Sequence, residues 1–229
     1  MTGNSLIIAK NIYKSYKNGN NILPVLEKIS FEIKEKDFVT VVGPSGIGKS
    51  TLLNIIGTLD KPDSGSIEFD GQNLSKMNDI QLSDLRLNMI GFVFQFHHLI
   101  PEFNVIDNVI MPNLIAEKKP NYSMAKDLLD HVRIIDKLNS FPSQLSGGEK
   151  ARVAVARALM NNPKIIFADE PTGNLDAENA ERLIDLLLKV KEDFDLTIVL
   201  STHNKKLSKL GNKKFEISKN QFKISDHIK

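Results

Sequence analysis

Hydrophobic positions near the start of the chain alternate with polar ones, as they do in strands that bury one face. Residues 5–16 (SLIIAKNIYKSY) and 25–33 (VLEKISFEI) are two such segments, separated by the polar loop KNGNN. The charged turn KEKD follows the second segment. Strands of this kind commonly pair in antiparallel order, with one face on the core and the other in water. The pattern therefore predicts an antiparallel β-layer within residues 5–41.

A different pattern begins at residues 38–42, where FVTVV is a continuous apolar run that ends in a glycine-rich loop. The segment LLNIIGTL at 52–59 follows with helical spacing. Two more apolar runs, IIFADE at 165–170 and LTIVLSTH at 196–203, flank a helical segment at 178–192. Continuous runs are typical of strands buried on both faces, and the strand–helix–strand order is typical of a parallel sheet. The predicted fold class is therefore α/β.

The middle of the chain gives a mainly helical signal. SGSIEFDGQNL at 64–74 predicts a turn, a strand and a second turn. From about Gln81 to Met160 the pattern is mainly helical, with breaks into short helices at Pro101, Pro112, Pro120 and Pro142. We interpret the part after Gln95 as a helical insertion, and the lysine-rich end of the chain as a closing helix with small strands.

Composition narrows the class of partner. The 229 residues carry a formal net charge of +2, which gives no basic excess of the size that nucleic-acid binding needs. There is no Cys, so a disulfide framework and a thiolate metal site are both excluded. No apolar run approaches the ~18 residues of a membrane span, and Thr2 stands where N-myristoylation would need glycine. We expect a cytoplasmic protein that binds no nucleic acid.

The loop after the 38–42 strand carries the first chemical motif. GPSGIGKST matches G-x-x-x-x-G-K-[ST] and lies between a predicted buried strand and a helix, where its mechanism requires it. The glycines let backbone N–H groups form one concavity, and the helix N-terminus adds partial positive charge. A glycine-rich turn with a solvated lysine is the simpler alternative. The predicted phosphate-binding residues are Gly43, Pro44, Ser45, Gly46, Ile47, Gly48, Lys49, Ser50 and Thr51.

Within this loop Lys49 is expected to reach the β- and γ-phosphates, and Ser50 to ligate Mg²⁺. A second motif follows the IIFADE strand, which delivers Asp169 and Glu170 to the carboxyl edge of the sheet, where ligands bind in open α/β folds. Asp169 would hold Mg²⁺ through water, and Glu170 would polarise an attacking water. Paired acids also occur at helix N-caps, so their place after a buried strand is what favours the site.

The segment LSGGEKARVAVARAL at 145–159 predicts a capping box, with Ser146 as N-cap and Glu149 three residues later. Its two glycines weaken the first turn, and their expected use is to expose N–H groups to a nearby anion. One nucleotide hardly needs two such helix starts from one subunit. The second is therefore expected to serve a nucleotide that a partner copy holds.

At this point the sequence resembles the ATP-binding subunits of ABC transporters along nearly its whole length. The resemblance implies a P-loop NTPase (RecA-like) core over residues 1–95 and 162–229, with an antiparallel β-subdomain. Residues 96–161 would form a helical ABC subdomain. The matching residues beyond the first loop are Tyr16 as the adenine-stacking aromatic, Gln95 of the Q-loop, the signature Leu145–Glu149, Asp169, Glu170, the D-loop Asn174–Asp176 and the switch histidine His203.

The family mechanism implies a head-to-tail homodimer that binds ATP and Mg²⁺. Each ATP would lie between one P-loop and the other copy's Ser146, Gly147 and Gly148. The resemblance makes Glu170 the base, His203 the residue that aligns the water, and Ser50, Gln95 and Asp169 the residues around Mg²⁺. Two departures stand out, because Glu149 replaces the commoner Gln and Asn204 follows the histidine where many relatives have Asp.

The apolar stretch FQFHHLIPEF at 94–103 adds a finer resemblance. Together with MPNLIAEKKP, LSGGE and ADEPTGNLD it is similar to the lipoprotein-releasing group of the family. That resemblance implies an ATPase at the cytoplasmic face of the bacterial inner membrane, peripheral to it and docked to transmembrane subunits near Gln95–Val109, with no direct contact to the lipoprotein. Four apolar side chains of the stretch are either docking residues or core of the helical subdomain: Phe96, Leu99, Ile100 and Phe103.

Other interpretations remain open at this stage. Within the family, the chain is alternatively the ATPase of a macrolide-exporter-like or cell-division complex. A non-transporting ATP-binding regulator of a membrane partner is an alternative of another class. A P-loop kinase would explain the first motif but not Gln95 and the second glycine-rich helix start. A soluble DNA-repair or translation ATPase of the same superfamily is disfavoured, because the chain has one nucleotide module, no long coiled-coil insertion and little net positive charge. The adjacent His97 and His98 would suit a metal pair, but adjacent histidines without a nearby Cys or a well-spaced set of carboxylates are more often polar or packing residues.

Overall fold

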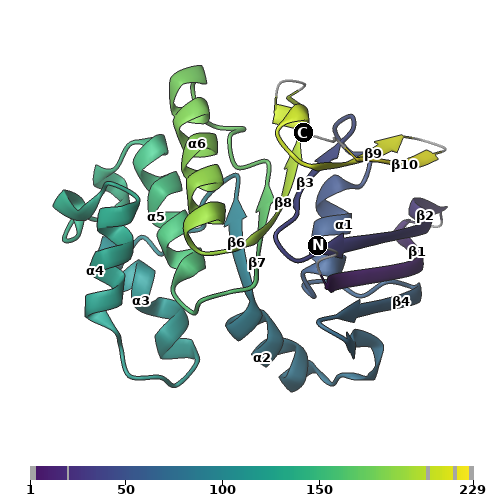
Figure 1. The fold of residues 1–229 in the computed structure, drawn as a ribbon, viewed down its shortest axis with the longest axis horizontal. Coiled ribbons are helices and arrows are strands. Elements are labelled where there is room, and N and C mark those ends of the chain that lie inside the picture. Colours follow the sequence, from purple (N-terminus) through teal and green to yellow (C-terminus); the bar gives the residue numbers. More distant parts are fainter. Residues whose placement is uncertain (1–3, 20, 205–206, 219–220, 227–229) are drawn as a thin grey trace. The chain divides into compact units, whose positions relative to one another are not determined.

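The computed structural model describes residues 4–19, 21–204, 207–218 and 221–226 (Figure 1). The chain divides into two compact units. The first is drawn from residues 1–83 and 197–229, and the second consists of residues 84–196. The P-loop lies in the first unit and the signature segment in the second.

The first unit contains an antiparallel sheet in the order β2-β1-β4-β5. Its long central strand β1 (Ser5–Asn18) pairs with β2 (Asn21–Lys34) on one side and with β4 (Ser64–Phe69) on the other. The short β5 (Gln72–Asn73) completes it. In the second half of β2 alternate residues are buried, namely Ile29, Phe31 and Ile33, which is the period of a half-buried strand. The predicted antiparallel layer is confirmed.

The same unit holds the strand that carries the P-loop. β3 (Phe38–Val42) lies between β8 (Thr197–Thr202) and β9 (Lys213–Ser218) and is parallel to both. β10 (Gln221–Asp226) then pairs with β9 in antiparallel order. The loop after β3 leads into α1 (Lys49–Ile56), whose Leu and Ile side chains are buried. The predicted order of strand, loop and helix is confirmed.

The second unit combines two parallel strands, β6 (Ile90–Phe94) and β7 (Ile165–Asp169), with four helices. The chain enters this unit through α2 (Asp79–Met89). The four helices are α3 (Val105–Ile115), α4 (Tyr122–His131), α5 (Gly147–Leu159) and α6 (Ala177–Asp193). Of these, α5 is the predicted signature helix and α6 is the predicted helix after IIFADE.

The structure corrects three sequence-based expectations. Residues 90–94 form a strand rather than part of a helix, because IGFVF pairs along β7 and a short apolar run does not reveal its period. Pro112 lies inside α3 instead of ending a helix, and its carbonyl accepts hydrogen bonds from Ala116 N and Asn161 Nδ2. In the described part of the chain end, a 3-10 turn at Leu207–Lys209 stands in place of the closing helix.

Candidate active site

The P-loop connects β3 to α1 through three glycines that the backbone requires. Gly48 is the N-cap of α1 and is left-handed, with φ of 109°, and a Cβ there would meet Val25 Cγ1 at 2.7 Å. A Cβ at Gly43 would meet the carbonyl oxygen of Ile217 at 2.5 Å. At Gly46, which has φ of 75°, the space is open. The loop therefore depends on glycine for close approach at two positions and for conformation at the third.

Lys49 is only 5% exposed, and its ammonium points back into the loop. Its Nζ donates to the carbonyl oxygens of Gly43 and Pro44, both at 3.0 Å. The first turn of α1 contains no acidic residue, so the partial positive charge of the helix start is not offset there. Ser50 is exposed and Thr51 half-buried. A cleft of about 440 Å³ has Gly46 and Ile47 among its lining residues.

Tyr16 and His203 belong to the same unit as the P-loop. Tyr16 is 42% exposed, and its hydroxyl donates to Asp60 Oδ2 at 2.8 Å. His203 follows β8 and is exposed, and the next residue donates its backbone N–H to Thr202 Oγ1 at 3.0 Å. Thr202 is the sheet partner of Val42, the last residue before the P-loop. The register of β3 and β8 therefore brings His203 and the P-loop to one edge of the sheet.

A parallel arrangement in the second unit brings Gln95 and the acidic pair together. Phe94 at the end of β6 is the sheet partner of Asp169 at the end of β7. Glu170 then adopts a left-handed conformation with φ of 46°, which is unfavourable for a residue with a side chain. Its carbonyl accepts a hydrogen bond from Gly173 N at 2.9 Å, closing a turn. The strand ends thus deliver all three polar side chains to one edge.

Gln95 is held in place by the turn after β7. Its Nε2 donates to Asn174 Oδ1 at 3.1 Å, and Asn174 Nδ2 donates to the backbone oxygen of Gln95 at 3.4 Å. Gly173 packs against the same side chain, since a Cβ there would come within 2.7 Å of Gln95 Nε2. In the sequence Gln95 and the D-loop belong to separate motifs, and only the fold shows that Gln95 and Asn174 of the D-loop are hydrogen-bonded to each other.

The signature segment begins α5 with the predicted capping box. Ser146 Oγ accepts from Glu149 N at 3.3 Å, and Glu149 Oε2 accepts from Ser146 N at 2.7 Å. These hydrogen bonds, the backbone one first, hold the pKa of Glu149 below its usual value. Ser146 and Gly147 are exposed, whereas Gly148 is buried. A Cβ at Gly148 would meet Asn179 Oδ1 at 2.6 Å, so this glycine allows α5 to approach α6.

The stretch after Gln95 is fixed by two residues that motif analysis did not find. Asn108 is fully buried, accepts from Ile100 N at 2.7 Å, and donates to three carbonyls of residues 100–104. Arg157 of α5 donates to the carbonyl oxygens of His97 at 2.6 Å and His98 at 2.7 Å. The signal available in the sequence was an Asn inside an apolar helical segment. It indicates that neighbouring backbone groups need a partner.

The side chains of this stretch divide into exposed and buried ones. Phe96 is 70% exposed and Phe103 is 36% exposed, while Leu99 and Ile100 are half-buried. His97 is buried, and burial lowers its pKa, with the nearby charges of Lys150 and Arg157 acting in the same direction. The four apolar side chains therefore differ in how far they are available for docking, and Phe96 is the most exposed of them.

Comparison with known proteins identifies the family. Residues 26–173 match the ABC transporter family. The chain belongs to the ABC transporter family. It is 44% identical over 211 residues to the lipoprotein-releasing system ATP-binding protein LolD of Cytophaga hutchinsonii, with 91% of this chain and 94% of the relative covered. The LolD of Rickettsia bellii is 42% identical, with 97% and 99% covered. Membership makes the chain an ATPase of this family.

Solved structures of the family have the same fold. The ATP-binding cassette MJ0796, solved as a dimer in a post-hydrolysis state bound to ADP and phosphate, superposes with a TM-score of 0.88 and is 37% identical. The alignment covers 96% of this chain and 98% of that one. CbiO1 from Clostridium perfringens, part of the ABC transporter complex cbiONQ, gives a TM-score of 0.86 at 26% identity, with 97% and 88% covered. The α/β P-loop NTPase fold expected from the sequence is confirmed.

Proposed function

We propose that this chain is the ATP-hydrolysing subunit of a transporter that releases lipoproteins from the bacterial inner membrane. The observation that carries the ATPase part is the P-loop itself. Lys49 Nζ points into this glycine-containing loop, and the first turn of α1 contains no acidic residue that would repel a phosphate. The cargo is supported by relatives from three bacteria, 42–45% identical, that are named as lipoprotein-releasing ATP-binding proteins.

The residues of the P-loop bind the phosphates of ATP. Backbone N–H groups of Ser45–Gly48 and of the start of α1 supply dipoles, and Thr51 adds a hydroxyl contact to phosphate. Lys49 exchanges its contacts with the carbonyl oxygens of Gly43 and Pro44 for the β- and γ-phosphate oxygens, which form stronger, charge-assisted hydrogen bonds. Tyr16 stacks on the adenine base. Binding thus replaces weak contacts within the loop by contacts with the ligand.

Hydrolysis requires a base and an aligned water. Glu170 takes the proton from the attacking water, and its left-handed backbone fixes the direction in which the carboxylate leaves the strand end. His203 contacts the γ-phosphate and helps to align that water. Glu170 directly follows the last residue of β7, and His203 directly follows the last residue of β8. Their positions are therefore set by sheet register rather than by a long loop.

The expected Mg²⁺ fits the donors that these residues offer. Ser50, Gln95 and Asp169 present hydroxyl, amide and carboxylate oxygens, the hard ligands that this ion prefers, and none of them is fully buried. When bound, Mg²⁺ would offset the negative charge of the β- and γ-phosphates. The Asn174 hydrogen bond orients Gln95 toward this role, because it occupies the amide nitrogen and leaves the amide oxygen as the donor atom for the ion.

The signature residues serve a second copy of the chain. Ser146 and Gly147 are exposed at the start of α5, where backbone N–H groups can meet the phosphates of the other copy's ATP. The capping box keeps the Glu149 carboxylate on Ser146 N, which turns its charge away from that anion. We therefore propose a head-to-tail homodimer that closes on two ATP molecules. The dimeric MJ0796 cassette supports this assembly.

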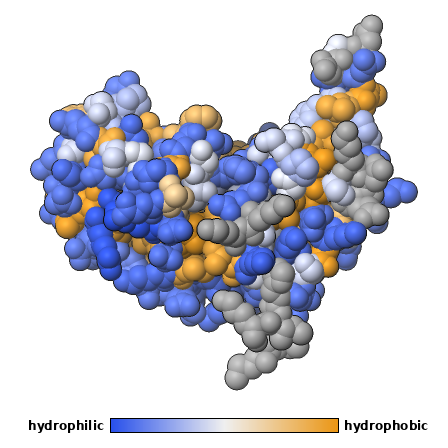
Figure 2. All heavy atoms as spheres, turned by 90° about the horizontal axis from the view of Figure 1, so that it is seen from above, coloured by the Kyte–Doolittle hydropathy of each residue, from blue (hydrophilic) through white to orange (hydrophobic). Residues whose placement is uncertain are grey.

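Several exposed apolar residues of the second unit are available for contact with a transmembrane partner. Phe96, Leu114, Ile115 and Tyr122 are all exposed, at 70%, 44%, 62% and 48%. On the face that Figure 2 displays, hydrophobic residues lie in several separate patches among hydrophilic ones. Among the described residues, no helix is both long and apolar enough to cross a bilayer. We propose that the subunit binds at the cytoplasmic face, docks near Gln95–Val109 and never contacts the lipoprotein.

The test is a pull-down of tagged Glu170→Gln protein with ATP from solubilised native membranes, with the copurifying proteins identified by mass spectrometry. Recovery of lipoprotein-releasing membrane subunits is the expected result. Recovery of drug-export or cell-division subunits would leave the ATPase chemistry standing and overturn the cargo. The wild-type protein, assayed alongside, separates a transporter ATPase from a regulator, because a regulator would bind its membrane partner without sustained ATP turnover.

A further inference from the structure

Lys14 is a buried lysine for which the ATPase chemistry has no use. It lies on β1 and is 8% exposed, although lysine side chains are rarely this buried unless they are paired. Its Nζ donates to Asp60 Oδ1 at 2.8 Å and to the carbonyl oxygen of Lys61 at 2.7 Å. Asp63 Oδ1 lies 3.8 Å from the same nitrogen. The ammonium is therefore held by several oxygens of residues 60–63.

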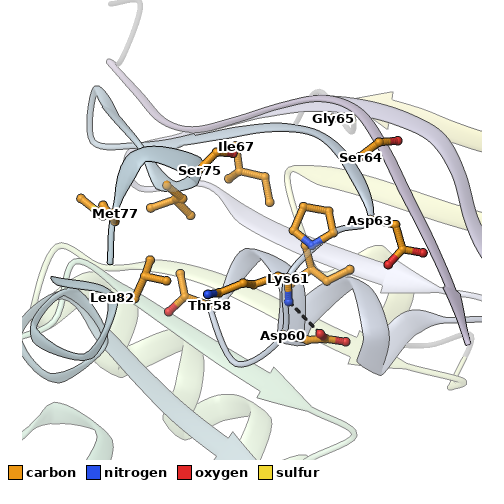
Figure 3. A pocket seen from close by; sticks show the side chains of 13 residues that line it. Thr58, Asp60, Lys61, Asp63, Ser64, Gly65, Ile67, Ser75, Met77 and Leu82 are labelled. Carbon is orange, nitrogen blue, oxygen red and sulfur yellow. Dashed lines mark hydrogen bonds between the residues drawn. The ribbon is translucent and has the colours of Figure 1, made fainter. Parts of the chain in front are cut away.

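Asp60 uses both of its carboxylate oxygens. Oδ1 accepts from Lys14 and also from the backbone N–H of Lys61 at 2.7 Å, a contact drawn in Figure 3. Oδ2 accepts from the Tyr16 hydroxyl at 2.8 Å. Asp60 also borders a cavity of about 320 Å³ (Figure 3), and no P-loop residue is among those that line it. The carboxylate thus connects a buried cation to the ring that is expected to stack on adenine.

The Tyr16 ring is fixed at its face as well as at its hydroxyl. Lys14 Nζ lies over the ring, 5.1 Å from its centroid, which is within cation–π range. A ring has two faces, and the ammonium occupies only one of them. The opposite face remains for a base, and the 42% exposure of Tyr16 agrees with this.

We propose that Lys14 and Asp60 are positioning residues that hold the Tyr16 ring in place for stacking on the adenine of ATP. The inference rests on the proposed ATPase function. It adds that contacts from β1 and the 60–63 loop favour ligands that carry adenine. A ring held by its hydroxyl and by a cation loses little rotational freedom when the base binds, and preorganisation of this kind raises affinity. Neither residue contacts phosphate in this scheme.

The charge states agree with a permanent network. Burial would lower the pKa of Lys14, but the hydrogen bond and charge of Asp60 hold that pKa above its usual value. Burial would raise the pKa of Asp60, whereas hydrogen bonds from Lys14 and Tyr16 keep it below its usual value. Burial and the hydrogen bond to Asp60 raise the pKa of Tyr16, so its hydroxyl stays protonated and continues to donate. The network therefore persists at neutral pH.

A simpler role is that the Lys14–Asp60 pair only ties β1 to the 60–63 loop. The two roles differ in what they do to ligands without a base. A structural tie, once broken, would disturb the P-loop and weaken every phosphate ligand alike. A positioning pair affects ATP but leaves inorganic tripolyphosphate unchanged, because that ligand carries the phosphates and lacks the adenine.

The experiment measures the equilibrium Kd of ATP and of tripolyphosphate for four full-length proteins: wild type, Tyr16→Phe, Asp60→Ala and the double variant. Tyr16→Phe keeps the ring and removes only the hydroxyl, so it carries the test if Asp60→Ala fails to fold. We expect each single variant to raise the ATP Kd by about 3–10-fold, the range of one hydrogen bond, with the tripolyphosphate Kd unchanged. Asp79→Asn, which breaks the exposed Lys61–Asp79 pair, is the matched control and should change neither Kd.

The double variant decides whether the residues act through one contact. If they do, its ATP Kd equals that of a single variant rather than the product of the two effects. The chain has 3 Tyr, so ring-labelled tyrosine also gives a small set of NMR signals. The Tyr16 signal should shift with ATP and not with tripolyphosphate, and the shift should shrink in Asp60→Ala.

Two results would overturn the inference: equal losses for ATP and tripolyphosphate, or an ATP Kd that none of the variants changes. Either one leaves the proposed ATPase function intact, because wild type still binds and hydrolyses ATP. Failure of wild type to bind ATP would instead overturn the proposed function itself, so the two failures are distinguishable. Tyr16→Leu, which removes the aromatic ring, should raise the ATP Kd by about 10–100-fold if stacking occurs at all.

Discussion

Gln95 donates its side-chain amide to Asn174 Oδ1 at 3.1 Å, and this contact joins the residue after β6 to the turn after β7. Gly173 leaves room for it, because any Cβ at that position would press on the Gln95 amide. The proposed Mg²⁺ contact through Gln95 is therefore prepared by a residue that does not itself touch the ion. Such supporting contacts commonly tune metal affinity.

Replacing Asn174 by Ala tests this support. We expect ATP binding without metal to be unchanged and the Mg²⁺ concentration for half-maximal ATPase activity to rise about 10-fold, because Gln95 loses the partner that orients it. Magnesium titrations of the ATPase rate measure the effect, and Asn139→Ala, a change at an exposed loop residue, is the control. Loss of ATP affinity with an unchanged magnesium requirement would show that Asn174 acts on something other than the ion.

Glu170→Gln tests the general base. Turnover should fall by about 10²–10⁴-fold while ATP affinity stays near that of wild type, since the change removes a proton acceptor and no phosphate contact. An ATP-bound dimer should accumulate and be visible by size-exclusion chromatography with light scattering. Glu178→Gln, which alters an exposed carboxylate paired with Arg182, serves as the matched control. Turnover close to wild type in Glu170→Gln would remove Glu170 from the mechanism.

The lowered pKa of Glu149 predicts how stability depends on pH. A carboxyl whose pKa is lower in the folded than in the unfolded state stabilises the fold above the unfolded value, about 4.5, and loses that contribution as the pH falls through its folded value. Glu149→Gln keeps an oxygen acceptor for Ser146 N but no charge. We expect the free energy of unfolding, measured with urea, to fall more steeply below pH about 4.5 in wild type than in the variant. Glu181→Gln, on the exposed face of α6, should behave like wild type.

Phe96→Asp tests the docking surface. The side chain is 70% exposed, so a charge there should leave the fold and the isolated ATPase activity intact and abolish copurification with membrane subunits. Ile80→Asp is the matched control, because Ile80 is equally apolar and 74% exposed but lies on α2. Phe103 is a weaker choice at 36% exposure. Equal copurification of Phe96→Asp and wild type would place the partner on another surface.

Most residues of the proposed site belong to local motifs that the sequence alone shows. The P-loop, the capping box at Ser146 and the acidic pair after β7 each depend on neighbours within a few residues, so spacing alone located them. The division into a core at 1–95 and 162–229 with a helical part at 96–161 stays a prediction. What the sequence did not reveal depends on distant partners. β6 is a strand because β7 lies beside it, and Gln95 is oriented by a residue 79 positions away.

The same limit applies to single side chains. Nothing local in the sequence marks Arg157, yet its guanidinium donates to the carbonyl oxygens of His97 and His98, 60 and 59 positions earlier in the chain. Lys14 lies in a strand pattern that gives no sign of its burial against Asp60. Both roles come from tertiary contacts, which neither periodicity nor residue type encodes.

At position 170 the left-handed backbone favours a different residue from the one that the proposed catalysis needs. A glycine at that position would relieve roughly 1 kcal/mol of conformational strain, and asparagine part of it. A library screened only for heat resistance would therefore enrich inactive sequences at residue 170. Thermostable versions of this ATPase should be selected on turnover at the same time, or position 170 should be kept constant while the rest of the chain is varied.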